Sequence, residues 1–382
     1  MIILIKTFPI FWHRPKYYYS LYNDNNVITQ QPYCYKNIVI ILFTLFMSGC
    51  ASVDYYAQSI QGQFEVIQKR QHINTLLSSG NPPTRLRTEL ETVLELRRFS
   101  INQLGLPNNN SYLSYADLER DYVIWNIFAT EEFSLSPVKW CYLIVGCLDY
   151  RGYFSESDAR QHTSKLKEQG HDVYLGGVSA YSTLGWFDDP VLNTMLRWDD
   201  VQLATVMFHE LAHQQLYIKD DTEFNEAYAE TVAIIGVTKW LEQSPDKNLL
   251  IDYEQSQTQE KQFIILVLKY KALLSELYRS GTNKVQMRKE KETLFRQMTN
   301  EYNTLSRHWE KDHYSQWFAT GLNNAKLAAI VTYRQYTSSF LGIFNKLDKD
   351  LNRFYSLMKS LSLCKQMKRK EILITQQIKF EC

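Results

Sequence analysis

Apolar residues along this chain follow two different periods. Before residue 110 they recur at helical spacing, which predicts helices over residues 55–77 and 84–104. Three later segments are short and rich in β-branched and aromatic residues, and they predict strands at residues 122–128, 142–145 and 172–178. The first half of the chain therefore combines helices with a small sheet.

The helical period returns near residue 200 and continues almost to the carboxyl end. Asp199 and Asp200 are suited to cap the first of these helices, and residues 223–240 predict a second. Residues 262–277 predict a third, which a Ser-Gly-Thr-Asn break separates from a charged helix ending near Trp309, as in a helical hairpin. The expected fold class is α+β, mainly helical, with a small mixed β-sheet upstream of the capped helix and a helical carboxyl-terminal part.

The capped helix carries His-Glu-Leu-Ala-His at residues 209–213. Because a helix turns every 3.6 residues, His209 and His213 project from one face and can each place a nitrogen on the same metal ion. Glu210 lies beside them, within reach of a water molecule in the open coordination position, whose proton it can take. This order of residues is the pattern of a catalytic zinc site.

A catalytic zinc needs a third protein ligand and keeps its fourth position for water. Glu226 suits this role, because residues 220–222 offer N-cap oxygens and place Glu226 in the first turns of the next helix. Glu230 shares its face and can accept a hydrogen bond from a ligand imidazole. The sequence thus predicts one Zn²⁺ ion bound by His209, His213 and Glu226.

The alternative for the capped helix is a solvated surface with two histidines that bind nothing. The Asn-Glu pair at residues 225–226, at the start of the next helix, favours the metal site over this alternative. The other histidines of this half of the chain, and those before it, stand singly or in charged helical surroundings. Solvated or structural roles are therefore expected for His72, His162, His171, His308 and His313.

Several segments resemble one protein family. Phe-His-Glu-Leu-Ala-His-Gln at 208–214, Phe-Asn-Glu-Ala-Tyr at 224–228 and the Gly-Gly and Asp-Asp-Pro stretch at 173–190 are similar to bacterial predicted aminopeptidase lipoproteins, which are zinc-dependent peptidases of the gluzincin type. The resemblance covers roughly residues 50–360, since it extends to residues 94–99, 140–147, 150–154 and 323–327.

This resemblance implies a zincin-like fold for the chain. It also implies zinc binding by His209, His213 and Glu226, with Glu210 as the general base. The word aminopeptidase rests on the family alone, because no residue pattern in this sequence shows recognition of a free N-terminus.

The amino end predicts export and lipid attachment. An apolar run over 38–47 ends in Met-Ser-Gly-Cys at 47–50, which is the form of a signal peptide with a lipoprotein cleavage box. Cleavage makes Cys50 the lipidated first residue, and Ala51 after it favours a bacterial outer membrane, facing the periplasm. The alternative is an uncleaved anchor, but a bilayer core takes roughly 20 apolar residues. Residues 1–35 are an overlong start, which suggests a true start codon further along.

Cleavage before Cys50 divides the chain into unequal parts. Residues 1–49 are expected to form the signal peptide, 50–362 one zinc peptidase domain and 363–382 a basic tail. Lys and Arg number 42 against 41 Asp and Glu, a net charge of +1. No broad cationic field results, which argues against a nucleic-acid partner.

The cysteines suit an exported protein. Cys141 and Cys147 bracket a short loop, which predicts a disulfide in an oxidising compartment. Cys364 and Cys382 either pair or stay free in a frayed tail. The basic run at residues 365–370 in this tail is most simply a solvated patch.

Some polar residues are candidates for contact with a substrate. Tyr333 or Tyr181 can donate a hydrogen bond to the oxyanion opposite the metal, and so can the amides of Asn323 and Asn324. Helix or core packing is the alternative for each of them.

The segment at residues 173–185 is the expected sheet edge, to which an extended peptide can add its backbone. Gly176 and Gly177 permit close backbone approach there, although a bulge explains them equally well. Asp188 or Asp189 can hold a substrate amine, but Asp-Asp-Pro is also ordinary turn chemistry.

The sequence therefore favours a lipid-anchored zinc metallopeptidase, an aminopeptidase by resemblance, that cleaves peptide or protein substrates at the cell envelope. An alternative is an envelope lipoprotein that acts mainly as a zinc-binding chaperone or assembly factor with little hydrolytic activity. A third reading, hydrolysis of cell-wall amides, uses the same chemistry on another substrate, and the sequence does not separate it from peptide cleavage.

Overall fold

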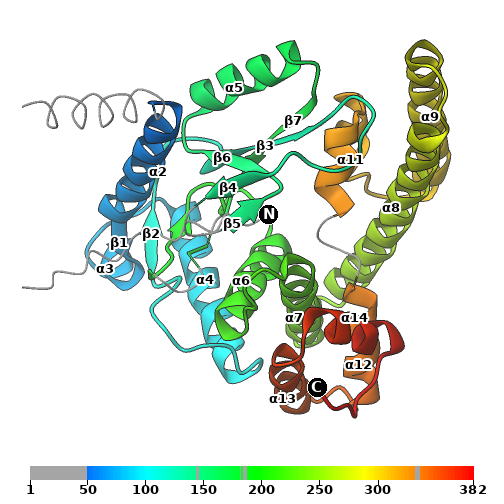
Figure 1. The fold of residues 1–382 in the computed structure, drawn as a ribbon. Helices are drawn as coiled ribbons and strands as arrows, with labels where there is room; N and C mark the ends of the chain where they lie inside the picture. The colour runs from blue at the N-terminus through cyan, green and yellow to red at the C-terminus, as the bar shows by residue number, and fades with distance from the viewer. Residues whose placement is uncertain (1–49, 143–145, 181, 184–186, 332–335) are drawn as a thin grey trace, which may run out of the picture.

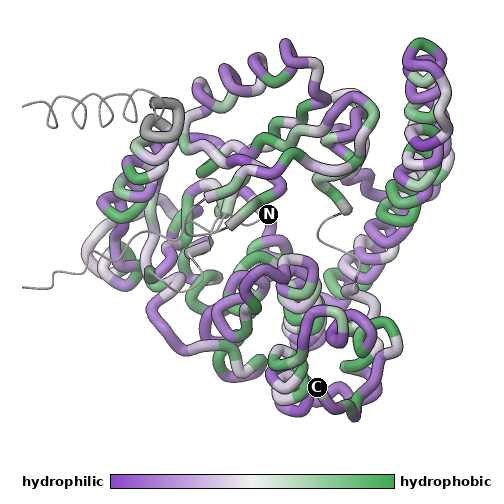
Figure 2. Tube along the Cα trace, viewed as in Figure 1, coloured by the Kyte–Doolittle hydropathy of each residue, from purple (hydrophilic) through white to green (hydrophobic). Residues whose placement is uncertain are grey.

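The computed structural model describes residues 50–142, 146–180, 182–183, 187–331 and 336–382. Helices make up most of this part, and small sheets lie among the helices that precede α6 (Figure 1). The expected signal peptide over residues 1–49 lies outside it. Polar residues interrupt the apolar ones along the long helices (Figure 2), and no described helix is long and apolar enough to cross a membrane.

The amino-terminal elements are α2 (Cys50–Gln68), β1 (Arg70–His72), α3 (Ile73–Ser78) and α4 (Thr84–Asn102). The prediction of a single helix over residues 55–77 is wrong, because the chain leaves helical conformation after Gln68 to form β1. This strand pairs antiparallel with β2 (Ser114–Ala116), a long-range contact that local periodicity does not reveal. The predicted helix over residues 84–104 is confirmed, beginning at Thr84 and ending two residues early.

The strands form three separate small sheets and not the single mixed sheet predicted from the sequence. In the first sheet, β2 pairs antiparallel with β1 and parallel with β8 (Val191–Leu192). The third sheet is a hairpin of β4 (Trp140–Tyr142) and β5 (Gly146–Leu148). The predicted disulfide between Cys141 and Cys147 joins the two strands of this hairpin.

The second sheet has the order β6-β3-β7 and is antiparallel throughout. Its central strand is β3 (Ile124–Thr130), and its edge strands are β6 (Arg151–Tyr153) and β7 (Asp172–Val178). The strand predicted over residues 172–178 is confirmed with both its ends, and it lies at an edge, as expected for the segment from residue 173 onward. The register between β3 and β7 runs without interruption from Ile124 opposite Val178 to Thr130 opposite Asp172.

Helices cover both faces of this second sheet. On one face, α5 (Glu156–Glu168) packs Ala159 and Leu166 against the side chains of β3 and β7. On the other, Lys326 of α11 (Asn324–Val331) lies over the ring of Tyr174. Successive side chains of a strand point to opposite faces, so β7 packs against a helix on each face. Its outer edge does not pair with another described strand of the sheet.

Two helices, α6 (Asp200–Gln215) and α7 (Thr222–Glu242), pack along each other in the main core. Gly236 of α7 allows this close packing, because a Cβ at this position would lie 2.6 Å from Leu104 and 2.8 Å from Phe208. The helices predicted after Asp199 and over residues 223–240 are thus confirmed.

The chain after α7 is helical. The predicted hairpin consists of α8 (Asn248–Arg279) and α9 (Lys284–Leu305), which share a separate apolar cluster with α10 and α11. The remaining elements are η1 (Ser306–His308), α10 (Ser315–Ala319), α12 (Thr337–Lys346), α13 (Leu351–Ser362) and α14 (Gln366–Thr375).

The expected basic tail is part of the fold. Cys364 and Cys382 form a disulfide, and α14 lies between them. Arg369 is only 7% exposed and donates to Asp221 at the start of α7, with distances of 2.9 Å from Nε and 2.6 Å from Nη2. The prediction of a solvated patch is therefore wrong for Arg369, whose charge is buried in an ion pair.

Candidate functional site

Local caps fix the two helices that carry the predicted metal ligands. Asp199 accepts a hydrogen bond of 2.8 Å from the backbone N–H of Gln202, and Asp221 accepts one from Phe224. Each carboxylate thus satisfies a free N–H in the first turn and sets the residue at which the helix begins. The sequence predicts a helix cap at both places, from Asp199 or Asp200 and from residues 220–222.

Hydrogen bonds around the connection between α6 and α7 place Glu226 opposite the histidines. The side-chain amide of Asn225 both accepts from the N–H of Ile218, at 2.8 Å, and donates to its carbonyl, at 2.7 Å. The hydroxyl of Tyr228 donates to Gln215 at 2.7 Å. These bonds hold the short connection between α6 and α7, so the residue after Asn225 faces the last turns of α6.

Three donor groups meet at this place. The Nε2 atoms of His209 and His213 lie 3.1 Å apart. Glu226 places Oε2 at 3.4 Å from Nε2 of His209 and Oε1 at 3.7 Å from Nε2 of His213. Within the described part of the chain, this is the group of His, Cys, Asp and Glu side chains that is able to hold a metal ion. The structure therefore brings together the three predicted ligands.

Electrostatics couple these groups. Burial alone would lower the pKa of His209, but hydrogen bonds to Glu226 and Glu230 outweigh burial and raise this pKa to about 9. Burial alone would raise the pKa of Glu226, but the charge of His213 and hydrogen bonds from both imidazoles hold it well below its usual range. Glu230 lies 3.5 Å from Nδ1 of His209, which is the position predicted for a carboxylate that orients a ligand.

Glu210 is 3% exposed, and its Oε2 atom has no hydrogen-bond partner in the described residues. Burial raises the pKa of this carboxyl. A buried carboxylate oxygen without a partner is costly, so Glu210, next to the three predicted ligands, is a candidate for proton exchange with a bound molecule.

His209 and Glu210 open into a cavity of about 1500 Å³. It is also lined by Gly177 and Val178, the last two residues of β7, and by Ser179 and Ala180, which follow this strand. His313, for which the sequence analysis expects a solvated or structural role, also lines the cavity. Only the path of the chain after α9 brings this histidine close, so no local signal marks it.

The outer edge of β7 faces this cavity with part of its backbone. The carbonyl of Val178 accepts from the N–H of Val123 and thus points toward β3. Backbone groups of an antiparallel strand alternate in direction, so those of Val173, Leu175 and Gly177 point outward. The uninterrupted register excludes a bulge here. Gly177 instead makes room for the ring of Tyr122, which a Cβ would approach to 2.4 Å.

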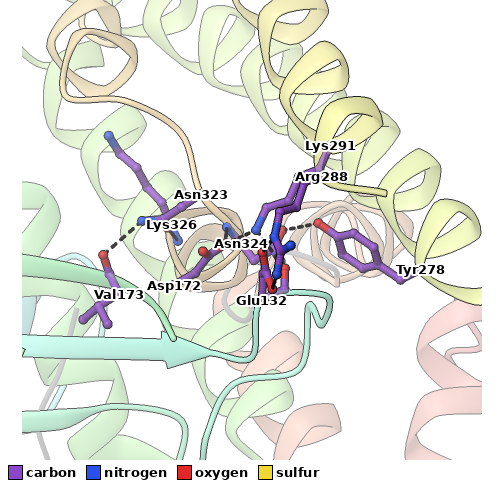
Figure 3. A network of polar contacts seen from close by, with 9 residues as sticks. All are labelled: Glu132, Asp172, Val173, Tyr278, Arg288, Lys291, Asn323, Asn324 and Lys326. Carbon is purple, nitrogen blue, oxygen red and sulfur yellow. Dashed lines mark hydrogen bonds and ion pairs between the residues drawn. The ribbon is translucent and has the colours of Figure 1, made fainter. Parts of the chain in front are cut away.

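Asn323 and Asn324 close the start of this edge (Figure 3). Asn323 donates from Nδ2 to the carbonyl of Val173 at 3.0 Å, while Asn324 donates to the carbonyl of Glu132 at 2.9 Å and, from its backbone, to Asp172 at 2.9 Å. The α8–α9 hairpin adds three more polar side chains to this network: Tyr278, Arg288 and Lys291. Each amide thus uses an N–H within the fold, and neither side chain is among those that line the cavity beside His209, which favours the packing role over that of an oxyanion donor.

The Asp-Asp-Pro turn holds the other end of the same segment. Asp189 is 1% exposed, accepts from the hydroxyls of Ser182 and Thr183 at 2.9 and 2.7 Å, and accepts from Gln214, next to His213, at 3.3 Å. Both carboxylate oxygens of Asp189 already accept hydrogen bonds from the protein, so this residue stabilises the turn and does not receive a substrate amine. Asp188 is exposed; its carboxylate accepts from Asn110 at 3.4 Å, and its backbone carbonyl accepts from Arg70 at 2.7 Å. The candidates Tyr181 and Tyr333 lie outside the described residues.

Comparisons with known proteins agree with the extent of this fold. No curated protein and no solved structure matches the chain. A family model, however, matches residues 54–373, from the second turn of α2 to the last turn of α14, and so includes the cluster at 209–226 and about half of the expected tail. By this match the chain belongs to the family described as "Putative aminopeptidase".

Proposed function

We propose that this protein is a zinc-dependent aminopeptidase with a zincin-like fold, attached to the bacterial cell envelope through lipid on Cys50. The observation that carries the proposal is the donor triangle of His209, His213 and Glu226. In a tetrahedral site with Zn–N bonds of about 2.05 Å, neighbouring ligand atoms lie about 3.3 Å apart. The two imidazole nitrogens, 3.1 Å apart, and the nearer carboxylate oxygen at 3.4 Å from His209 are close to this value, and with one atom taken from each residue the three ligand atoms all lie within 4.8 Å of one another.

The donor chemistry supports zinc over a hard cation. Two imidazole nitrogens with one carboxylate are the ligand set of catalytic zinc, whereas magnesium and calcium prefer oxygen ligands throughout. Glu230 would accept a hydrogen bond from the N–H at Nδ1 of His209. This arrangement leaves the lone pair of Nε2 of the same imidazole for the metal. When bound, zinc supplies a Lewis acid that polarises the scissile carbonyl and acidifies the attacking water.

Glu210 carries the proton transfers in this proposal. Its free Oε2 takes a proton from the attacking water, and the raised pKa of the buried carboxyl favours holding that proton until it passes to the departing amine. No covalent bond to the protein is needed. The outward backbone groups of Gly177, which lines the same cavity as Glu210, and of Leu175, two residues before it, would hold the peptide in extended form, since an open edge can pair with one more strand.

Two features support an envelope location. Both cysteine pairs of the described chain, Cys141 with Cys147 and Cys364 with Cys382, are disulfides, which persist in oxidising compartments. The sequence before Cys50 is the second feature, because an apolar run followed by Met-Ser-Gly-Cys has the form of a lipoprotein cleavage box.

A defined peptide mixture, analysed by mass spectrometry after incubation with the zinc-loaded protein, tests the function. Stepwise loss of amino-terminal residues is expected. Internal cuts would keep the zinc mechanism and contradict the aminopeptidase assignment. Absence of any cut by protein that holds one zinc would contradict the peptidase itself and favour the binding role.

Zinc affinity is expected to rise with pH. His209 holds a proton up to about pH 9 in the metal-free cluster, so zinc must displace it, and affinity should increase about tenfold per unit between pH 6.5 and 9. Competition with a chelator at pH 6.5, 7.5 and 8.5 measures this slope. The Glu230→Gln variant loses one carboxylate that raises the pKa of His209, so its slope should level off at lower pH. A flat profile in both proteins would contradict the coupling.

The same shifts set the stability of the metal-free protein. The pKa of His209 is raised above its unfolded value of 6.5, so its contribution is complete below pH 6.5 and is lost as pH rises through about 9. The pKa of Glu226 is lowered, so its contribution is present above its unfolded value of 4.5 and is lost in acid. The cluster thus stabilises the metal-free fold most between pH 4.5 and pH 6.5, where both contributions are complete.

Replacing Asn323 by Ser is expected to weaken peptide binding. Ser keeps an oxygen that can cap α11, where Asn323 now accepts from the N–H of Lys326, but it is too short to reach the carbonyl of Val173. The edge of β7 should loosen, so KM for peptides should rise several-fold while kcat and zinc content stay near normal. Steady-state kinetics with Asn300→Ala on the exposed side of α9 as control measure the difference, and equal KM values would contradict a positioning role.

A further inference from the structure

The outer face of α2 has an unusual composition for a surface helix. Three large apolar side chains at a spacing of four residues are exposed on it: Tyr56 by 38%, Ile60 by 61% and Phe64 by 57%. The other exposed positions of this helix whose side chains are described carry no charge either: Ala57, Gln61 and Gln68. A stripe of this kind without charge marks a contact surface, because single exposed apolar residues on soluble helices are usually flanked by charged ones.

The opposite face of α2 fixes the direction of this stripe. The ring of Phe154 packs directly onto Gly62, where a Cβ would lie 2.1 Å from it, and Gln58 accepts from the backbone N–H of Phe154 at 3.0 Å. Glu65 is bound by Arg120 at 2.7 Å. The helix therefore does not rotate or lift independently, and whatever covers the stripe also orients the whole domain.

The chain before the helix indicates what covers it. The apolar run over residues 38–47 is separated from Cys50, where α2 begins, by only Ser48 and Gly49. With a rise of 1.5 Å per residue, Phe64 lies about 21 Å from Cys50 along the axis. Acyl chains on Cys50 would bring the bilayer surface to one end of α2, and a helix lying flat would then place the entire stripe in that surface.

We propose that α2 lies along the phospholipid bilayer, with Tyr56, Ile60 and Phe64 in the headgroup region. This inference rests on the proposed lipid attachment at Cys50. Tyr and Phe are suited to this depth, where an apolar body meets a wet boundary. The α8–α9 hairpin, which lies on the opposite side of the fold from α2 (Figure 1), would point away from the membrane.

A label with a matched control tests the orientation. The mature lipoprotein is prepared as two variants, Phe64→Cys and Val285→Cys. Val285 is 62% exposed at the start of α9 and serves as the control position. Each introduced thiol receives the same environment-sensitive fluorophore. The disulfide-bonded cysteines do not react. In phosphatidylcholine vesicles that contain doxyl-labelled lipid, quenching at position 64 should exceed quenching at position 285 at least threefold.

Equal quenching at the two positions would overturn the orientation. A mass of the same sample that shows an unmodified Cys50 would also overturn it. Shielding of position 64 in lipid-free detergent that increases with protein concentration would instead assign this face to contact with a second copy of the chain, and would overturn the proposal as well. Peptide cleavage is measured in parallel. Loss of cleavage with retained quenching would contradict the proposed catalysis and leave the membrane contact intact.

Discussion

Glu210→Gln is expected to lower peptide cleavage by about 10²- to 10⁴-fold while leaving zinc content at one ion per chain. The amide keeps the shape of the side chain but cannot take a proton from water, and general base catalysis contributes a factor of this size. The ligand triangle of His209, His213 and Glu226 does not include Glu210, so metal binding should persist. Initial rates and metal analysis of the same preparation measure both effects.

Glu95→Gln is the matched control for this experiment. Glu95 lines the same cavity but lies outside the metal cluster, so its loss removes an equal charge without removing the base. Its rate should stay within a few-fold of the parent protein. A similar fall in both variants would indicate that cavity charge, and not proton transfer by Glu210, limits the reaction.

Arg369→Ala is expected to destabilise the protein by about 3–5 kcal/mol, because it leaves the buried carboxylate of Asp221 without its partner. Asp221 is 3% exposed, so water does not replace the lost guanidinium. The free energy of unfolding from urea titration measures the loss, and zinc affinity should fall with it, since Asp221 caps the helix that carries Glu226.

The neighbouring residue offers the control. Lys370 pairs with Glu223 at 2.8 Å, but both side chains are about 40% exposed. Lys370→Ala should therefore cost at most about 1 kcal/mol, as is usual for exposed ion pairs. Equal losses in the two variants would mean that the buried pair adds nothing specific to the stability of α7.

The parts of this structure that the sequence predicted well are governed by local spacing. His209 and His213 share a face because they are one turn apart, and Asp199 and Asp221 cap helices because their oxygens reach an N–H three residues on. Glu226 was placed correctly for a related reason. The connection from α6 to α7 is short, so little conformational freedom remains for the second helix.

The parts that the sequence predicted poorly depend on partners far along the chain. β1 was read as helix, since its pairing partner β2 begins more than 40 residues later. For Asn323 and Asn324 local spacing does not distinguish packing from oxyanion binding, because the carbonyls they bind, in Val173 and Glu132, are 150 and 192 residues away. Arg369 was read as solvated since nothing local marks Asp221 as its partner.

The pairing of Arg369 with Asp221 has a consequence for the order of events during synthesis. The two residues are 148 positions apart, a stretch that a ribosome completes in about 7 to 30 seconds. Throughout this interval α7 lacks the guanidinium that neutralises its buried cap. Helices α6 and α7 therefore lack this ion pair until α14 has been synthesised and has docked, so a chain that stops before Arg369 should lose the same stability as the Arg369→Ala variant.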